Sequence, residues 1–421
     1  MLTSAFIAAV SLALFWMAAF TLWWQMHAWR TPKVLASTRF DRPDDVAGQL
    51  SFSLLLPARH EQAVLGHTIR RLLRSTHADF EIIVIVGHDD PGTTEVAAEA
   101  AERDRRVRVV VDTHEKKNKP KAMNTALPHC RGDVVGVFDA EDQVHPELLA
   151  HVDHAFRTTG ADVVQGGVQL INFHSSWYSL RNCLEYFFWF RSRLHLHAQK
   201  GFIPLGGNTV FVRTDVLREA GGWDPDCLAE DCDLGVRLSS AGKKVVVAYD
   251  SDMVTREETP GSLMALLKQR TRWNQGFLQV YRKKDWKRLP TFRQLLLARY
   301  TLMTPFLQAF SGVVIPLNAA VALFLDVPAS IAFLTFLPLV AAAATFVFEV
   351  VGLHDFGRQY GLRVRFIHYV KLLVGGPFYQ ALLAGAAIRA VWREQRGHND
   401  WELTAHAGAH LTAVPREEVP A

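Results

Sequence analysis

Val137-Phe138-Asp139-Ala140-Glu141-Asp142 is the stretch that decides the fold of this 421-residue chain. The residues from Val134 to Phe138 have the apolar pattern of an inner strand, and three carboxylates follow at once. Clustered carboxylates repel one another unless a cation neutralises them. We therefore expect a strand that ends in a divalent-metal site for a phosphorylated ligand, at the edge of a sheet. A solvated acidic turn is the alternative for this stretch alone.

The strand belongs to a longer alternation of strands and helices. Such alternation predicts an α/β fold with a mostly parallel sheet and helices on both faces. Ligands bind these sheets at the carboxyl ends of the strands. Neither a GxGxxG nor a GxxxxGK[ST] motif occurs, so no dinucleotide fold or P-loop is indicated. The expected strands are residues 51–56, 81–86, 107–111 and 133–138, and the expected helices are 61–74 and 119–127.

The composition favours a membrane-associated protein and gives no sign of nucleic-acid binding. The net charge is +4, and 49% of the residues are hydrophobic. Residues 2–26 carry no formal charge, and about 20 apolar residues suffice to cross a bilayer. Arg30 and Lys33 follow this span, which places the next domain in the cytoplasm. A cleaved signal peptide would have a basic start and a shorter apolar run.

Two further polar segments suit a sugar-nucleotide site. Ala229-Glu230-Asp231-Cys232-Asp233 precedes an expected helix at 234–239, where capping alone would explain one carboxylate. In Gln269-Arg270-Thr271-Arg272-Trp273, helical spacing puts Gln269, Arg272 and Trp273 on one face. An indole beside a guanidinium suits a sugar or uracil ring with a diphosphate. An amphipathic helix lying on the membrane is the alternative.

Together with Asp90, which precedes them in the chain, these three segments resemble the D, DxD, ED and QxxRW series of the membrane-embedded family 2 glycosyltransferases, the group of cellulose, hyaluronan and poly-N-acetylglucosamine synthases. The resemblance covers residues 54–277. Residues 118–124 also resemble the lysine-to-asparagine segment of that family, and residues 401–406 resemble its W-x-x-T tail. The second carboxylate of the DxD motif is Glu141, which leaves open whether Glu141 or Asp142 meets the metal.

The resemblance implies a GT-A type domain and inverting transfer from a nucleotide sugar, with UDP-sugar as the expected donor. It implies Asp231 as the general base, with Glu230 beside it, and Mg²⁺ or Mn²⁺ on Asp139 and Glu141. It implies donor contacts at Pro57, Ala58, Glu61, Asp90, Lys119, Asn124 and Asp139, acceptor or diphosphate contacts at Gly207, Gln269, Arg270, Arg272 and Trp273, and a gating tail at Trp401 and Thr404.

The expected domains are a transmembrane helix at 1–28, a cytoplasmic GT-A domain with interfacial helices at 48–290, a transmembrane region at 295–395 and a cytoplasmic tail at 396–421. Residues 178–196 are aromatic and basic, which predicts an interfacial helix, with a core helix as the alternative. The stretch between Arg299 and Asp326 and the stretch 327–348 carry no charge and are two expected spans. If the apolar stretch 366–390 is a third crossing after the cytoplasmic domain, the tail lies outside the cell. Because the family's tail lies inside, we expect that stretch to be re-entrant or to hide a further crossing.

Three functions remain open from the sequence. The first is transfer to a growing β-linked polysaccharide at the plasma membrane, with or without coupled translocation of the product. The second is a single transfer to a membrane lipid. The third, an inactive sugar-binding or scaffold subunit of an export complex, predicts missing carboxylates, whereas Asp139, Asp231 and Gln269 are all present. The expected partners are therefore the UDP-sugar, a glycan or lipid acceptor and membrane lipids, and the sequence names no protein partner.

Overall fold

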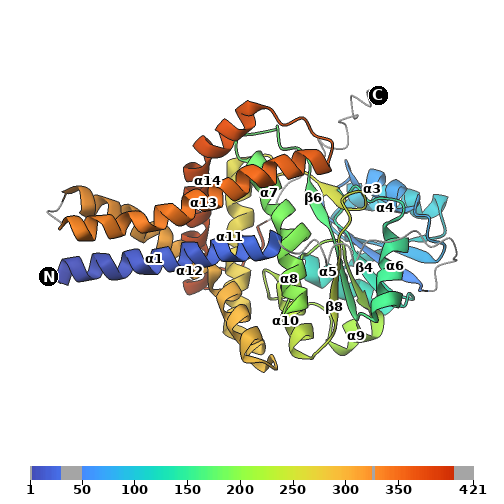
Figure 1. Cartoon of the computed structure of the whole chain (residues 1–421). Helices are drawn as coiled ribbons and strands as arrows, with labels where there is room; N and C mark the ends of the chain where they lie inside the picture. Colours follow the sequence, from blue (N-terminus) through green and yellow to red (C-terminus); the bar gives the residue numbers. More distant parts are fainter. Residues whose placement is uncertain (1, 30–49, 325–327, 403–421) are drawn as a thin grey trace.

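The computed structural model describes residues 2–29, 50–324 and 328–402. Its centre is a seven-stranded sheet in the order β3-β2-β1-β4-β7-β5-β8 (Figure 1). Neighbouring strands are parallel except β7, which is antiparallel to β4 and β5. The predicted α/β fold with a mostly parallel sheet is confirmed. The strands are β1 (Phe52–Ala58), β2 (Phe80–Gly87), β3 (Val107–Asp112), β4 (Val134–Val137), β5 (Val163–Gly166), β7 (Val210–Arg213) and β8 (Val245–Ala248), and β6 (Val168–Leu170) pairs with β9 (Thr255–Glu257) in a small second sheet.

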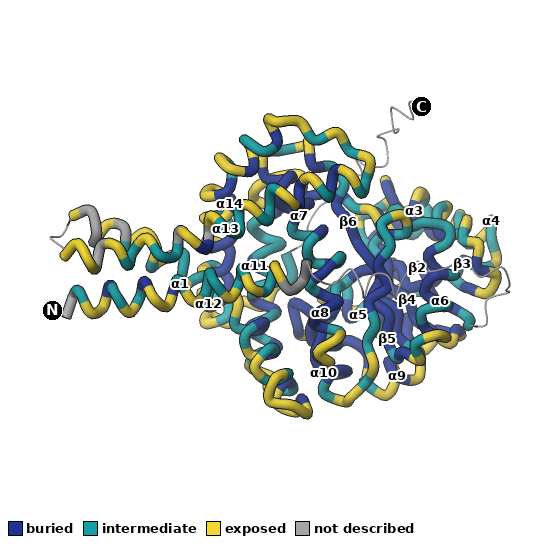
Figure 2. Tube along the Cα trace, viewed as in Figure 1, coloured by how far each residue is buried: buried dark blue, intermediate teal, exposed yellow. Residues whose placement is uncertain are grey.

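The sheet is buried on both faces because its inner strands are apolar at most positions. Successive side chains of a strand point to opposite faces, so Leu54 and Leu56 enter one core cluster while Leu55 enters the other. All three are fully buried, and Figure 2 shows the sheet as the darkest part of the molecule. The covering helices are α3 (Leu65–Leu72), α4 (Pro91–Arg103), α5 (Lys119–Ala126), α6 (Leu148–Thr159), α9 (Thr214–Glu219) and α10 (Glu230–Ser240).

The aromatic and basic stretch at 178–196 packs partly into the core, which agrees with the core-helix alternative. It forms α7 (Ser179–Phe188), a π-helical turn η2 (Trp189–Arg193) and α8 (Leu194–Gln199). Cys183 and Phe187 are fully buried in a cluster shared with Leu353 and Phe356. The segment therefore joins the sheet domain to the long C-terminal helices.

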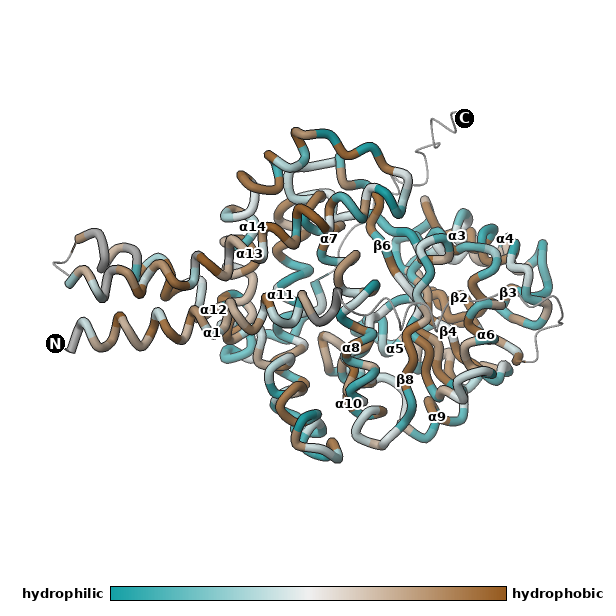
Figure 3. The backbone as a smooth tube through the Cα atoms, in the orientation of Figure 1, coloured by the Kyte–Doolittle hydropathy of each residue, from teal (hydrophilic) through white to brown (hydrophobic). Residues whose placement is uncertain are grey.

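Among the described residues, four helices are long and apolar enough to cross a membrane: α1 (Leu2–Trp29), α12 (Phe292–Phe324), α13 (Ala329–Gln359) and α14 (Phe366–Gln395). α1 packs along α13, and the two project away from the sheet together with the far part of α12 (Figure 1). Brown, hydrophobic segments run along this projection in Figure 3. These three helices therefore form an apolar bundle that leaves the sheet domain on one side.

α14 does not follow this bundle. It packs along α11 (Leu263–Lys283) and α12, and it runs crosswise to α1 and α13 between the bundle and the sheet domain (Figure 1). Pro377 lies inside it. The arrangement favours the re-entrant alternative for the last apolar stretch. The chain that follows α14 then reaches the carboxyl edge of the sheet.

Candidate active site

A cleft of about 1320 Å³ opens at the carboxyl edge of the sheet. β1 and β4 are adjacent and paired so that Leu55 lies opposite Val137, and the residues just beyond both strands therefore meet in this cleft. Most of the predicted site residues line it, whereas Thr404 lies outside the described residues. The lining residues are Pro57, Ala58, Glu61, Lys119, Asp139, Glu141, Gly207, Glu230, Asp231, Gln269, Arg270, Arg272, Trp273 and Trp401.

The three carboxylates after β4 have different surroundings. Asp142 is fully buried, and its carboxylate accepts hydrogen bonds from the backbone N–H of Asp139 at 2.8 Å and from Nδ2 of Asn208 at 2.8 Å. It therefore closes the turn. Asp139 and Glu141 instead line the cleft. Burial and the nearby Asp139 carboxylate raise the pKa of Glu141 to about 8, although the charge of Lys119 acts in the opposite direction.

Lys119 joins this turn to the second acidic segment. Its ammonium donates to Oδ1 of Asp139 and, at 2.7 Å, to the backbone oxygen of Gly207. Burial lowers the pKa of Lys119, but the carboxylates of Asp139, Glu230 and Asp231 more than reverse that effect and raise it overall. The structure therefore brings the two acidic segments to one cation at the N-terminus of α5.

The second acidic segment is the first turn of a helix. α10 begins at Glu230, four residues before the expected start, so Glu230 and Asp231 lie at its positive end rather than ahead of it. Burial and the neighbouring Asp231 carboxylate raise the pKa of Glu230 to about 7, and burial also raises the pKa of Asp231. A Cβ placed on Gly207 would lie 3.1 Å from Oδ2 of Asp231. The absence of a side chain at Gly207 therefore leaves room beside this carboxylate.

The helix α11 supplies the opposite wall of the cleft. Its Arg270 donates to Glu185 and, at 2.6 Å, to Oδ1 of Asn182, and its guanidinium lies 4.7 Å from the centre of the Trp273 ring. Arg272 lies 4.5 Å from the centre of the Trp401 ring. The segment that follows α14 therefore packs against the predicted arginine–tryptophan motif.

Two residues predicted to contact the donor, Asp90 and Asn124, are not among the described residues that line the cleft. Asp90 caps α4, accepting from the backbone N–H of Thr93 at 3.3 Å and of His60 at 2.5 Å. Asn124 donates to the backbone oxygen of Trp223 at 2.6 Å and accepts from its N–H at 3.0 Å. Both side chains are used by the backbone, and they position loops of the cleft.

Several lining residues were missed from the sequence. Glu185 lies in the aromatic stretch that predicted an interfacial helix, and Glu257 ends the short strand β9. Glu402 holds the post-α14 segment in place, accepting from Arg389 at 2.6 and 2.8 Å. For Glu185 the signal was an acid inside an otherwise aromatic and basic helix. For the other two, no local pattern separates them from surface glutamates.

The contact between α11 and the start of α10 leads to a testable prediction. A Cβ on Gly276 would lie 2.5 Å from the backbone nitrogen of Ala229, the residue before Glu230. Gly276→Ala is therefore expected to displace the first turn of α10, lower stability by roughly 1–3 kcal/mol and lower the activity of the protein. Thermal unfolding and turnover measure both effects. Gly385→Ala in α14, where a Cβ meets nothing within 4 Å, is the control, and equal behaviour of the two variants would contradict the prediction.

Comparison with known proteins identifies relatives that are named as sugar transferases or glycolipid synthases. The chain is 28% identical over 243 residues to the beta-monoglucosyldiacylglycerol synthase of Trichormus variabilis, covering 56% of this chain and 51% of that protein. It is 26% identical over 255 residues to glucomannan 4-beta-mannosyltransferase 7 of Arabidopsis thaliana, covering 57% and 46%. The chain thus spans about half the length of these curated relatives.

A solved structure matches nearly the whole chain. It is the mannosyltransferase PcManGT of Pyrobaculum calidifontis, in complex with GDP-Man and Mn²⁺, with a TM-score of 0.61 at 19% identity and coverage of 92% of this chain and 99% of that one. This likeness establishes the GT-A fold. The family model described as "Glycosyltransferase like family 2" matches residues 49–276, more than half of the chain. The chain therefore belongs to glycosyltransferase family 2.

Proposed function

We propose that this chain is a metal-dependent, inverting glycosyltransferase that moves a sugar from a nucleoside-diphosphate sugar to a hydroxyl of a membrane lipid. The observation that carries the proposal is Lys119, which binds Asp139 and is close enough to Glu230 and Asp231 for their charges to shift its pKa. A donor diphosphate at this point would lie between the two acidic segments. UDP-sugar is the expected donor, with Pro57, Ala58 and Glu61 toward the nucleoside.

Asp139 and Glu141 fit a divalent cation. Both are oxygen ligands in the cleft, and Mg²⁺ or Mn²⁺ commonly takes one or two carboxylates together with substrate phosphates. Among the described residues no group of three or more His, Cys, Asp or Glu side chains could hold a metal ion, so phosphate oxygens would complete the coordination. When bound, the cation stabilises the charge of the departing diphosphate.

Asp231 is placed to act as the general base. Its carboxylate accepts the proton of the acceptor hydroxyl, whose oxygen forms the new bond to the anomeric carbon as the bond to the diphosphate breaks. Attack from the face opposite the leaving group inverts the anomeric centre. A positioned base contributes roughly 10²–10⁴-fold to the rate. Gln269, Arg272 and Trp273 line the same cleft and would hold the diphosphate and the acceptor.

We further propose that the sheet domain is cytoplasmic and that the chain is anchored in the plasma membrane. If α1, α12 and α13 cross the membrane and α14 stays at its surface, the cleft and Trp401 fall on the same side. The contact between Trp401 and Arg272 requires this. The arrangement supports a cytoplasmic start for the tail, as the family resemblance implies.

A growing β-linked polysaccharide is the second candidate acceptor, because one relative is a glucomannan mannosyltransferase. The lipid is preferred because the beta-monoglucosyldiacylglycerol synthase matches with higher identity and because three crossing helices enclose little space for a polymer channel.

Membranes containing the full chain test the proposal with radiolabelled UDP-glucose, UDP-N-acetylglucosamine and GDP-mannose. One donor is expected to give a single product that migrates with lipids. EDTA should stop the reaction, and added Mg²⁺ or Mn²⁺ should restore it. A ladder of lengths would favour the polysaccharide, whereas product formation that EDTA leaves unchanged would contradict metal dependence.

A further inference from the structure

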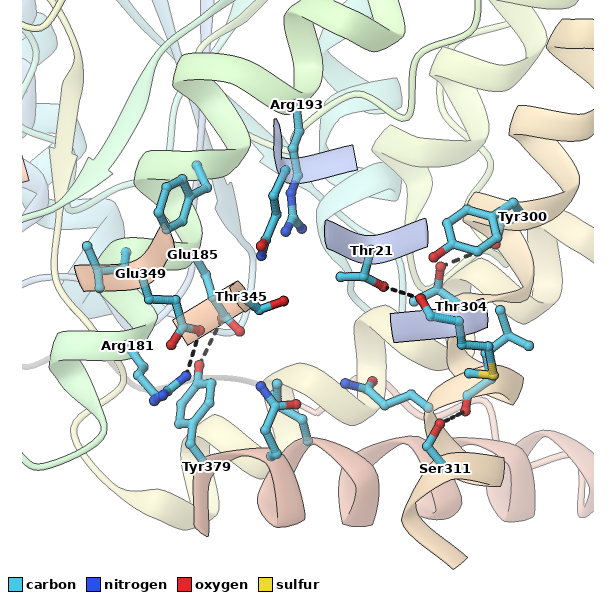
Figure 4. A pocket seen from close by; sticks show the side chains of 18 residues that line it. Thr21, Arg181, Glu185, Arg193, Tyr300, Thr304, Ser311, Thr345, Glu349 and Tyr379 are labelled. Carbon is cyan, nitrogen blue, oxygen red and sulfur yellow. Dashed lines mark hydrogen bonds and ion pairs between the residues drawn. The ribbon is translucent and has the colours of Figure 1, made fainter. Parts of the chain in front are cut away.

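A second cavity, of about 340 Å³, lies among the long helices (Figure 4). α1, α7, η2, α12, α13 and α14 all contribute to its wall, and we call it the helix cavity. Its wall is polar although most of these helices are apolar enough to cross a membrane. Polar groups at membrane depth are costly and mark substrate paths. The uncharged polar side chains that line it are Thr21, Gln25, Thr304, Gln308, Ser311, Thr345 and Gln380.

The charged groups of the helix cavity balance one another. Arg181 donates to Glu349 at 2.8 Å, and Glu185 accepts from the hydroxyl of Tyr379 at 2.8 Å. Arg193 reaches toward the middle of the cavity in Figure 4. The wall therefore carries two arginines and two glutamates. The formal charges of the wall sum to zero, which favours a neutral guest over an anionic phosphate.

Part of the wall still lacks partners. Among the residues that the structure describes, Oε1 of Gln25 and Nε of Arg193 are buried without a hydrogen-bond partner. Buried polar atoms are nearly always paired with protein or water. An acceptor and a donor that both remain open in the wall of one cavity are the complement of hydroxyl groups, which both donate and accept.

The helix cavity adjoins the cleft that contains Asp231. Glu185, Arg193 and Thr304 are among the residues that line both spaces. Glu185 also accepts from Arg270, whose guanidinium lies over Trp273 in the cleft. A molecule held among the helices could therefore present one end to the cleft that contains Asp231.

We propose that the helix cavity is the acceptor subsite and that it takes the uncharged, hydroxyl-bearing headgroup of a membrane lipid. The volume lies at the lower end of ordinary ligand pockets, which suits a headgroup whose chains remain in the bilayer. The amide and hydroxyl side chains bind its hydroxyls, and the balanced charges exclude phosphorylated headgroups. This inference rests on the proposed function, because it names the acceptor of the same reaction.

Filling the cavity tests the assignment. Thr345→Phe places a ring in the cavity from α13, and Val347→Phe adds the same ring two residues away at a position that is 59% exposed on the outer surface. With the full chain in vesicles and dioleoylglycerol as acceptor, Thr345→Phe is expected to lower kcat/KM for the lipid about tenfold or more. The KM for the donor should stay unchanged, and Val347→Phe should behave as the wild type.

A second substitution and a binding assay distinguish a filled cavity from a misfolded protein. Ser311→Phe fills the same cavity from α12, and UDP binding verifies an intact cleft in each variant. Dioleoyl phosphatidylglycerol, which keeps free hydroxyl groups beside its phosphate, should be at least about tenfold poorer as an acceptor than dioleoylglycerol. Full lipid transfer in the folded, filled variants would overturn the cavity assignment alone. Equal use of phosphatidylglycerol would overturn the neutral headgroup, and wild-type transfer to cello-oligosaccharides but to no lipid would overturn both the assignment and the proposed acceptor.

Discussion

Asparagine in place of Asp231 is expected to lower kcat by roughly 10²–10⁴-fold, with donor binding nearly unchanged. The carboxylate lies in the first turn of α10 and lines the cleft beside Gly207. Asparagine has the same shape but cannot take a proton from the acceptor hydroxyl. Single-turnover transfer from labelled UDP-sugar, together with UDP binding, separates the chemical step from binding. A rate within tenfold of the wild type would remove Asp231 as the base.

The pH profile gives this prediction a second readout. Burial raises the pKa of Asp231 above its ordinary value, and that of Glu230 is raised to about 7. Because the base acts as the carboxylate, the wild-type rate should rise with pH through the range above ordinary carboxyl values and be lost below it. The two acids are neighbours, so the apparent pKa belongs to the pair. The rate that remains in Asp231→Asn should rise less with pH than the wild-type rate, because the ionisation of the base no longer contributes.

Asp233, two residues further along the same helix turn, is the matched control. It is buried, it accepts from Arg237 at 2.8 Å and from Lys283 at 2.7 Å, and it lies outside the lining of the cleft. Asp233→Asn should therefore reduce thermal stability, because it removes the charge of a buried carboxylate that accepts from both Arg237 and Lys283. Asp231→Asn should leave stability almost unaffected. Opposite effects of the two variants would contradict the assignment of roles.

The sheet and the acidic turn were predictable because their signals are local. An apolar run that ends in carboxylates determines both the buried strand and its polar end, and β4 (Val134–Val137) lies within the expected strand, one residue shorter at each end. Glu141 could not be separated from Asp142 in this way. The choice depends on Asn208, a residue 66 positions away that binds the Asp142 carboxylate, and sequence order does not contain that contact.

Other features depend on packing that composition does not report. Asp90 looked like a base-binding acid, but the backbone of His60, 30 positions earlier, takes its carboxylate. The last apolar stretch has the composition of a membrane span, and an apolar helix face is the same whether lipid or protein covers it. Only the contacts with α11 and α12 turn α14 crosswise. The helix cavity, assembled from six separate segments, was equally invisible.

Replacement of Asp139 by asparagine is expected to have the second large effect, a loss of roughly 10²–10³-fold in kcat/KM with a much weaker response to added Mn²⁺ or Mg²⁺. Metal stabilisation of a transition state amounts to several kcal/mol, and each 1.36 kcal/mol is about tenfold in rate. Asp139 is the more exposed partner of Lys119 and lines the cleft, so the fold should survive the change.

Asp142→Asn separates the metal role from a merely structural one. Both oxygens of the Asp142 carboxylate accept hydrogen bonds within the turn, and asparagine would point an NH₂ group at one of the donors, which destabilises a buried site. We therefore expect Asp142→Asn to lower the melting temperature while its folded fraction keeps the wild-type metal dependence. Asp139→Asn should do the reverse. If Asp139→Asn retained the wild-type metal titration, the cation would have to be held elsewhere, and the pairing of Asp139 with Glu141 would no longer explain the cleft.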